Sequence, residues 1–158
     1  MQNRSLFRPP PLELVDKLRV LVVDDSPTMR GYLDTALRRL GHEVRACESY
    51  TAALGVAKEW PPHIAIIDVM LHGSPRGIGL GEVLREGWPE TSVGLISGYR
   101  YTQDQQRQAE SAVGGGLLLK PIPRSALVEM ESRVRRGQAV FPTLEERGCG
   151  SDSLLSMP

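Results

Sequence analysis

The sequence predicts an α/β fold, a three-layer α/β/α sandwich around a five-stranded parallel sheet. Four short runs contain only apolar residues and glycine, the pattern of strands that are buried on both faces: residues 20–23, 64–67, 93–96 and 117–119. Segments with helical spacing of apolar residues alternate with these runs, and parallel strands need such crossover helices. We therefore expect the strand order 2-1-3-4-5, with helices on both faces of the sheet.

The first half of the chain contains two strand–helix units. After the first strand, Ser26 is a suitable N-cap and Pro27 a suitable first residue of a helix. Residues 43–46 alternate like an edge strand, and a second helix is expected over residues 49–60, before two prolines. The apolar residues of the first helix recur at helical spacing: Met29, Leu33, Leu37 and Leu40.

The second half adds three more units. The strand at 64–67 leads into a glycine-rich loop, Gly73–Gly79, and then into a helix. The helix over about 102–112 is rich in glutamine, so it is either a solvated surface helix or a movable element. The residues expected to pack the third, fourth and fifth helices are Leu80, Val83 and Leu84, then Tyr101, Ala109, Ala112 and Val113, then Leu127, Met130 and Val134.

We expect one domain at residues 19–136, between an N-terminal arm (1–18) and a C-terminal tail (137–158). The arm is rich in proline, and the tail is rich in glycine and serine. The apolar residues of the tail are either disordered or complete a dimer: Val140, Phe141, Leu144, Leu154 and Leu155.

Composition favours a cytoplasmic protein. Lys+Arg and Asp+Glu balance at 19 each, so net charge indicates neither nucleic acid nor membrane as a partner. Cys47 and Cys149 form no paired motif, as expected in a reducing compartment. No apolar run approaches the roughly 20 residues that span a bilayer, and no signal peptide is evident.

Polar side chains follow four of the predicted strands at their carboxyl ends. Asp24 and Asp25 follow the first strand, Asp68 the third, Ser97 the fourth and Lys120 the fifth. The order 2-1-3-4-5 places these ends side by side, at the edge where parallel sheets bind ligands. The first acid pair alone indicates only a turn or a helix cap, but polar groups at four strand ends predict a site.

The predicted site has the composition for phosphoryl transfer. Three carboxylates repel one another unless a cation lies among them, and their oxygen atoms favour Mg²⁺. Lys120 and the Ser97 hydroxyl supply donors for phosphoryl oxygens. A carboxylate is then available as the nucleophile.

Over about residues 19–136, the sequence resembles a receiver domain of the two-component response regulators, with the flavodoxin-like fold of the chemotaxis regulators. Four segments carry the resemblance: Leu21–Arg30 (LVVDDSPTMR), Asp68–Leu71 (DVML), Ile96–Tyr99 (ISGY) and Lys120–Pro121.

The resemblance implies that a histidine kinase or phosphotransfer protein phosphorylates Asp68. It also implies that Asp25, Asp68 and the main-chain carbonyl of Met70 bind Mg²⁺ directly, whereas Asp24 acts mostly through water. Met70 and Tyr99 stand where receivers control the access of water to the phosphoaspartate. Because both are bulky and neither is an acid or an amide, we expect slow self-dephosphorylation.

In the same family, Ser97 is expected to move toward the phosphoryl group and Lys120 to pair with it. The Lys120–Pro121 peptide bond is expected to be cis. Leu117 stands where many receivers have an aromatic switch residue, so the signal is expected to pass through the Ser97 loop and the helix after it. His72 stands where proline is common and is interpreted as a solvated loop residue.

Family resemblance also predicts a downstream target protein and a partner or homodimer surface on helix 4, strand 5 and helix 5. The sequence after Arg136 contains no helix-turn-helix or basic stripe, so we expect a single-domain regulator without direct DNA binding. An intermediate in a phosphorelay and a phosphorylation-independent adaptor are the alternatives. A haloacid-dehalogenase-like phosphatase is disfavoured, because it needs Asp-x-Asp and the two acids here are adjacent.

Overall fold

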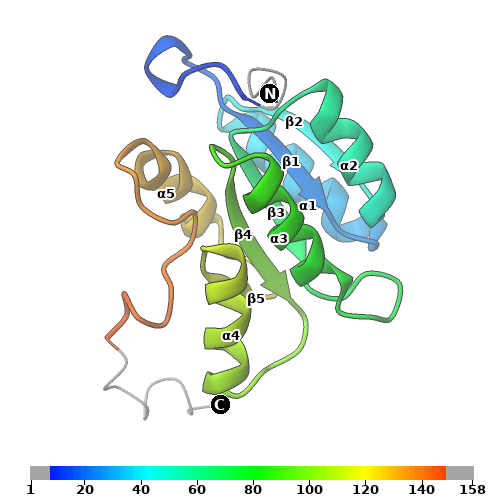
Figure 1. The fold of residues 1–158 in the computed structure, drawn as a ribbon. Coiled ribbons are helices and arrows are strands. Elements are labelled where there is room, and N and C mark those ends of the chain that lie inside the picture. The colour runs from blue at the N-terminus through cyan, green and yellow to red at the C-terminus, as the bar shows by residue number, and fades with distance from the viewer. Residues whose placement is uncertain (1–7, 149–158) are drawn as a thin grey trace.

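A computed structural model describes residues 8–148, which form a parallel sheet with helices on both faces (Figure 1). The five strands lie in the order β2-β1-β3-β4-β5, so the predicted fold class and strand order are confirmed. The strands are β1 (Arg19–Val23), β2 (Glu43–Cys47), β3 (Ile64–Asp68), β4 (Ser92–Ser97) and β5 (Leu117–Leu119). The helices are α1 (Pro27–Arg39), α2 (Tyr50–Glu59), α3 (Arg76–Gly87), α4 (Gln103–Val113), α5 (Arg124–Arg135) and the short 3-10 helix η2 (Leu12–Leu14).

Alternate residues of the interior strand β1 pack into two different cores. Val20 and Val22 belong to the core formed with α1 and α5. Leu21 and Val23 belong to the core formed with α2, α3 and α4. Because successive side chains of a strand point to opposite faces, a strand covered on both sides needs an unbroken apolar sequence.

Local signals set the starts of three helices. The Ser26 hydroxyl accepts from the Met29 N–H at 3.3 Å and caps α1, as predicted. Ser49 caps α2 in the same way. Helix α4 begins with a capping box, in which Thr102 and Gln105 each accept a hydrogen bond from the other's main-chain N–H.

Helix α3 begins at Arg76, so the prediction of a loop that extends to Gly79 is wrong. The reason lies at Gly77, in the first turn of the helix. A Cβ atom on Gly77 would collide with the main-chain carbonyl of Asp68. Glycine is therefore needed here for the close approach of α3 to the end of β3, and not for loop flexibility.

The described part of the N-terminal arm packs on the domain. Arg135 of α5 donates to the main-chain oxygens of Leu12 and Val15, at 2.7 and 2.9 Å. The ring Nε2 of His63, in the loop before β3, lies 2.6 Å from the oxygen of Pro10. No helix among residues 8–148 is long and apolar enough to cross a membrane.

Residues 137–148, the described part of the predicted tail, also pack on the sheet. Phe141 lies against Gly94 of β4, and its main-chain oxygen approaches Gly116 just before β5. The sequence left two roles open for these apolar residues, and the structure gives a third, packing within the same domain. Leu154 and Leu155 lie outside the described residues. Three tail residues are at most 1% exposed: Val140, Phe141 and Leu144.

Candidate functional site

Four strand ends bring the predicted site residues to the carboxyl edge of the sheet. Asp68 and Ser97 are the last residues of β3 and β4, whereas Asp24 and Lys120 directly follow β1 and β5. One carboxylate oxygen from each of Asp24, Asp25 and Asp68 lies within 4.8 Å of the other two. The structure therefore groups all three acids that the sequence singled out.

The ammonium group of Lys120 lies between two carboxylates. Its Nζ donates to Asp68 Oδ2 at 2.9 Å and lies 2.8 Å from Asp24 Oδ2, while Asp68 Oδ1 accepts from the Met70 N–H at 3.2 Å. Burial alone would lower the pKa of Lys120, but the two carboxylates outweigh burial and raise it. Burial raises the pKa of Asp68, and the charge of Asp24 adds to this effect while Lys120 opposes it. One ammonium group thus only partly compensates the acids.

Asp24 is fully buried, and its two carboxylate oxygens are satisfied unequally. Oδ1 accepts from the Ser26 N–H at 2.8 Å. Oδ2 lies 2.8 Å from Lys120 Nζ in an ion pair, and no described residue donates a hydrogen bond to it. A buried oxygen of this kind beside two further carboxylates fits a divalent cation with oxygen ligands, such as Mg²⁺.

Asp25 is held by a tight turn after β3. Leu71 and Ser74 exchange main-chain hydrogen bonds of 2.9 and 3.3 Å, and the turn residues His72 and Gly73 have φ angles of 53° and 81°. This turn directs the His72 N–H to Asp25 Oδ2 at 2.9 Å. His72 is exposed, as predicted, but sequence reasoning missed its contact with the acid. The available signal was the pair His72–Gly73, because a residue followed by glycine suits a turn that needs two left-handed conformations.

Ser97 is fully buried, and its hydroxyl is engaged by its own loop. The Oγ atom donates to the Tyr99 oxygen at 2.9 Å and accepts from the Tyr99 N–H at 3.0 Å. The Lys120 N–H donates to the Ser97 oxygen at 2.8 Å and ties together the ends of β4 and β5. The Lys120–Pro121 peptide bond is cis, as predicted. A contact between the Ser97 hydroxyl and a new ligand requires it to exchange its bonds to Tyr99.

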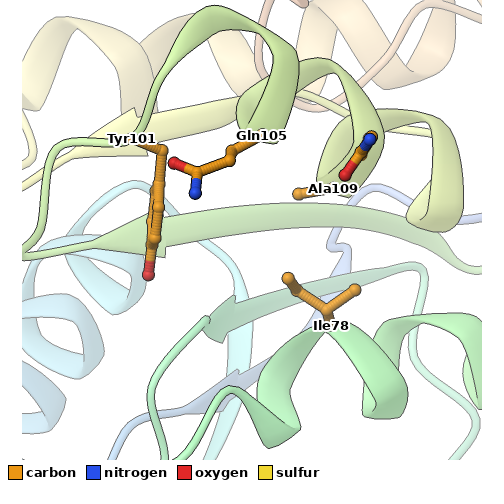
Figure 2. A pocket seen from close by; sticks show the side chains of 5 residues that line it. Ile78, Tyr101, Gln105 and Ala109 are labelled. Carbon is orange, nitrogen blue, oxygen red and sulfur yellow. The ribbon is translucent and has the colours of Figure 1, made fainter.

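Helix α4 follows the Ser97 loop and borders a cleft of about 320 Å³. In Figure 2, Ile78 of α3 lies across the cleft from Ala109 and Gln105, and Tyr101 borders one end. Farther along α4, Glu110 is 5% exposed and accepts from the main-chain N–H of Leu117 at 2.9 Å. Sequence reasoning missed Glu110, because a glutamate in a polar helix gives no sign of burial.

The chain matches a family model and curated relatives over this region. The model, described as "Response regulator receiver domain", matches residues 20–131. A similar relative is "Putative response regulator NtrX-like" of Rickettsia felis, 31% identical over 86 residues, which are 54% of this chain and 18% of that protein. The match therefore covers less than a fifth of the length of that relative.

Solved structures share the fold. A response regulator from Thermotoga maritima has a TM-score of 0.66 and 23% identity, over 75% of this chain and 97% of that one. A response regulator protein from Burkholderia pseudomallei, whose structure contains a phosphorylated aspartic acid, a calcium ion and citrate, has a TM-score of 0.65 and 25% identity, over 77% of this chain and 72% of that one. With acids, hydroxyl and lysine at four strand ends, this chain belongs to the response regulator receiver domain family of two-component systems.

Proposed function

We propose that this receiver domain accepts a phosphoryl group onto Asp68 from a phosphohistidine donor. The observation that carries the proposal is the contact between Lys120 Nζ and Asp68 Oδ2, within the cluster of three carboxylates. Asp68 supplies a carboxylate nucleophile, and Lys120 is already placed to pair with the group that Asp68 would receive.

In the proposed reaction, an Asp68 oxygen bonds to phosphorus while the phosphorus–nitrogen bond of the phosphohistidine breaks. The imidazole keeps the electron pair of that bond and takes up a proton. Lys120 then pairs with one phosphoryl oxygen, and the Ser97 hydroxyl donates to another after leaving Tyr99. When bound, Mg²⁺ would neutralise negative charge on the phosphoryl group. Asp25, Asp68 and the Met70 carbonyl would hold the ion directly, and Asp24 would hold it through water.

Similarity to the Burkholderia pseudomallei protein supports both the phosphorylation of Asp68 and the binding of a cation. That protein carries a phosphorylated aspartic acid and a calcium ion. In this chain, the fully buried Asp24 leaves one carboxylate oxygen without a hydrogen bond among the described residues, beside the other two acids. A cation held by the other two acids would place a bound water to donate to that oxygen, which is why we propose a metal-assisted acceptor site.

Phosphotransfer profiling tests the assignment of Asp68 as the phosphoryl acceptor. The chain is incubated with Mg²⁺ and a set of radiolabelled histidine kinases and phosphotransfer proteins, beside Asp68→Ala and the exposed control Asp104→Asn. Label is expected on the unmodified chain and on the control only. Label on Asp68→Ala would contradict the assignment of Asp68 as the nucleophile. Absence of label from every donor and from acetyl phosphate would favour a phosphorylation-independent adaptor, and onward transfer to a second histidine would identify a relay.

The proposed partners are a sensor kinase or phosphotransfer protein in the cytoplasm and a downstream target protein. Tyr99 and Leu119, which are 62% and 39% exposed, lie beside Ser97 and Lys120 and give the target an apolar contact next to the site. A homodimer through α4, β5 and α5 is part of the proposal. Light scattering with and without beryllofluoride and Mg²⁺ measures it, and a monomer in both states would exclude it.

We also propose that the phosphoaspartate is long-lived. Met70 and Tyr99, near Asp68 and Ser97 in the chain, supply neither an acid nor an amide to orient an attacking water. Decay of the acyl phosphate after labelling with acetyl phosphate measures the lifetime. A lifetime of seconds would contradict the proposal.

A further inference from the structure

Helix α4 is packed unevenly along its length. Its N-terminal half borders the cleft of about 320 Å³ opposite Ile78 (Figure 2). Its C-terminal half is tightly packed, because Val113 is 2% exposed and a Cβ atom on Gly81 of α3 would collide with it. The end nearest Ser97 therefore has room to move toward α3, and the far end has none on that side. A second cleft, of about 560 Å³ and lined by Arg85 and Glu145, borders the far end elsewhere.

Glu110 holds the C-terminal half of α4 from the side opposite the cleft. Its carboxylate accepts from the main-chain N–H of Leu117 in β5 and of Leu144, each at 2.9 Å, and from Gln106 Nε2 at 3.1 Å. A nearly buried carboxylate with two main-chain donors is a strong anchor, since removing it leaves buried N–H groups without partners.

Residues 137–148, here termed the clamp segment, are themselves firmly placed. The Phe141 ring packs so closely on Gly94 that a Cβ atom there would collide, and Gly116 is equally close to the Phe141 oxygen. Arg133 of α5 donates to the Ala139 oxygen at 2.8 Å and pairs with Glu146 at 2.7 Å, at the other end of the segment. The clamp segment thus joins α4, β4, β5 and α5.

We propose that Glu110 and the clamp segment form a fixed pivot for α4, so that phosphorylation moves only the N-terminal half of the helix over the cleft. The inference rests on the proposed function. Ser97 is the trigger, because breaking its bonds to Tyr99 displaces residues 98–102, which lead directly into α4. The surface that changes on activation is then this loop with the first turns of α4, while the clamp segment stays in place.

Amide exchange measured by NMR, with and without Mg²⁺ and beryllofluoride, tests the pivot on the unmodified chain. Exchange rates in residues 98–108 are expected to change about fivefold or more, while the Leu117 and Leu144 amides stay within about twofold. A comparable change at Leu144 would overturn the inference, because the clamp segment would then release. If beryllofluoride does not bind at all, the proposed function fails and takes the inference with it.

Glu110→Gln tests the anchor directly, with the exposed Glu145→Gln in the same segment as the matched control. A glutamine oxygen accepts from one main-chain N–H, but its amide group opposes the other. We expect the beryllofluoride response to spread to the amides of Val113 and Leu144 in Glu110→Gln and to remain local in the control. An unchanged pattern in Glu110→Gln would contradict the pivot. If this variant does not fold, the unmodified chain decides.

Discussion

The carboxyl and amino edges of the sheet satisfy their buried carboxylates in opposite ways. At the carboxyl edge, three carboxylates cluster, one ammonium group pairs with two of them, and an oxygen of Asp24 has no hydrogen bond from the described residues. At the amino edge, Glu110 has three donors, and Thr91 Oγ1 donates to the Pro62 oxygen at 2.7 Å.

Whether a buried carboxylate has its hydrogen-bond partners within the protein therefore distinguishes the ligand-binding edge of this domain from the edge that stabilises the fold. Repulsion among carboxylates is retained at the carboxyl edge because a bound ion or phosphoryl group can relieve it. At the amino edge, Glu110 and Thr91 are matched within the protein. The buried atom there without a hydrogen bond from the described residues is Nδ1 of His42, in a ring whose pKa is lowered by burial. Substitutions at the amino edge should lower stability, and those at the carboxyl edge should lower ligand binding without lowering stability.

The largest effect is expected at the amino edge, from Phe141→Ala. Phe141 is fully buried against Gly94, so removing its ring leaves a cavity. We expect the free energy of unfolding to fall by about 3–5 kcal/mol, measured by urea denaturation. Glu145→Gln, which changes an exposed residue of the same segment, should be neutral. A loss below about 1 kcal/mol for Phe141→Ala would mean that the clamp segment is not part of the core.

Gly116→Ala tests the same edge by crowding. The added methyl group would collide with the main-chain oxygens of Phe141 and Pro142. We expect a loss of about 1–3 kcal/mol in the free energy of unfolding. Gly79→Ala is the matched control, because no atom lies within 4 Å of a Cβ atom there and the position is helical. The control should be neutral or slightly stabilised, and equal losses in both variants would contradict the crowding.

The same contrast explains what the sequence predicted. Asp68 follows an unbroken apolar run, and Lys120 and Ser97 follow two others, so local patterns and strand order were enough to place them together. Four of the five strands followed from such runs, and β2 followed from the alternation of residues 43–46. The family resemblance then supplied the roles of single residues, such as the Met70 carbonyl, which no pattern in the chain indicates.

The amino edge was not predictable in this way, because its contacts join segments that are far apart in the sequence. Glu110 resembles its solvated neighbours until Leu117 and Leu144 reach it. Phe141 stands in a segment without periodicity, and Gly116 is interpreted as a loop glycine until the main chain of the clamp segment lies over it. Sequence patterns report burial within one element, and these residues are buried by the folding of another.

Asp25→Ala tests whether the carboxyl edge serves ligand binding and not stability. At tenfold excess over its Kd, Mg²⁺ should raise the free energy of unfolding of the unmodified chain by about 1.4 kcal/mol. The variant should show no such rise, and without Mg²⁺ it should be as stable as the unmodified chain or more stable, because one repelling charge is gone. Asp104→Asn, whose side chain is 89% exposed, is the control. Loss of folding in Asp25→Ala would contradict a ligand-binding role.

The smallest effect is the pH dependence that arises from Asp68. Because burial raises its pKa, the folded chain keeps this proton at pH values where the unfolded chain has lost it. The contribution of Asp68 to stability therefore falls as pH rises from the unfolded value of about 3.9 through the raised pKa. Asp68→Asn cannot titrate. Relative to the unmodified chain, it should gain stability over that range, in urea denaturation without Mg²⁺.

The opposite result would break the contrast between the two edges. If Asp68→Asn loses stability relative to the unmodified chain as pH rises, the ion pair with Lys120 outweighs the burial of Asp68 and the repulsion by Asp24. The carboxylates of the carboxyl edge would then be matched within the protein, as Glu110 is at the amino edge. In that case a bound cation would be unnecessary for the stability of the three carboxylates, and the Mg²⁺ response of Asp25→Ala would become the deciding measurement.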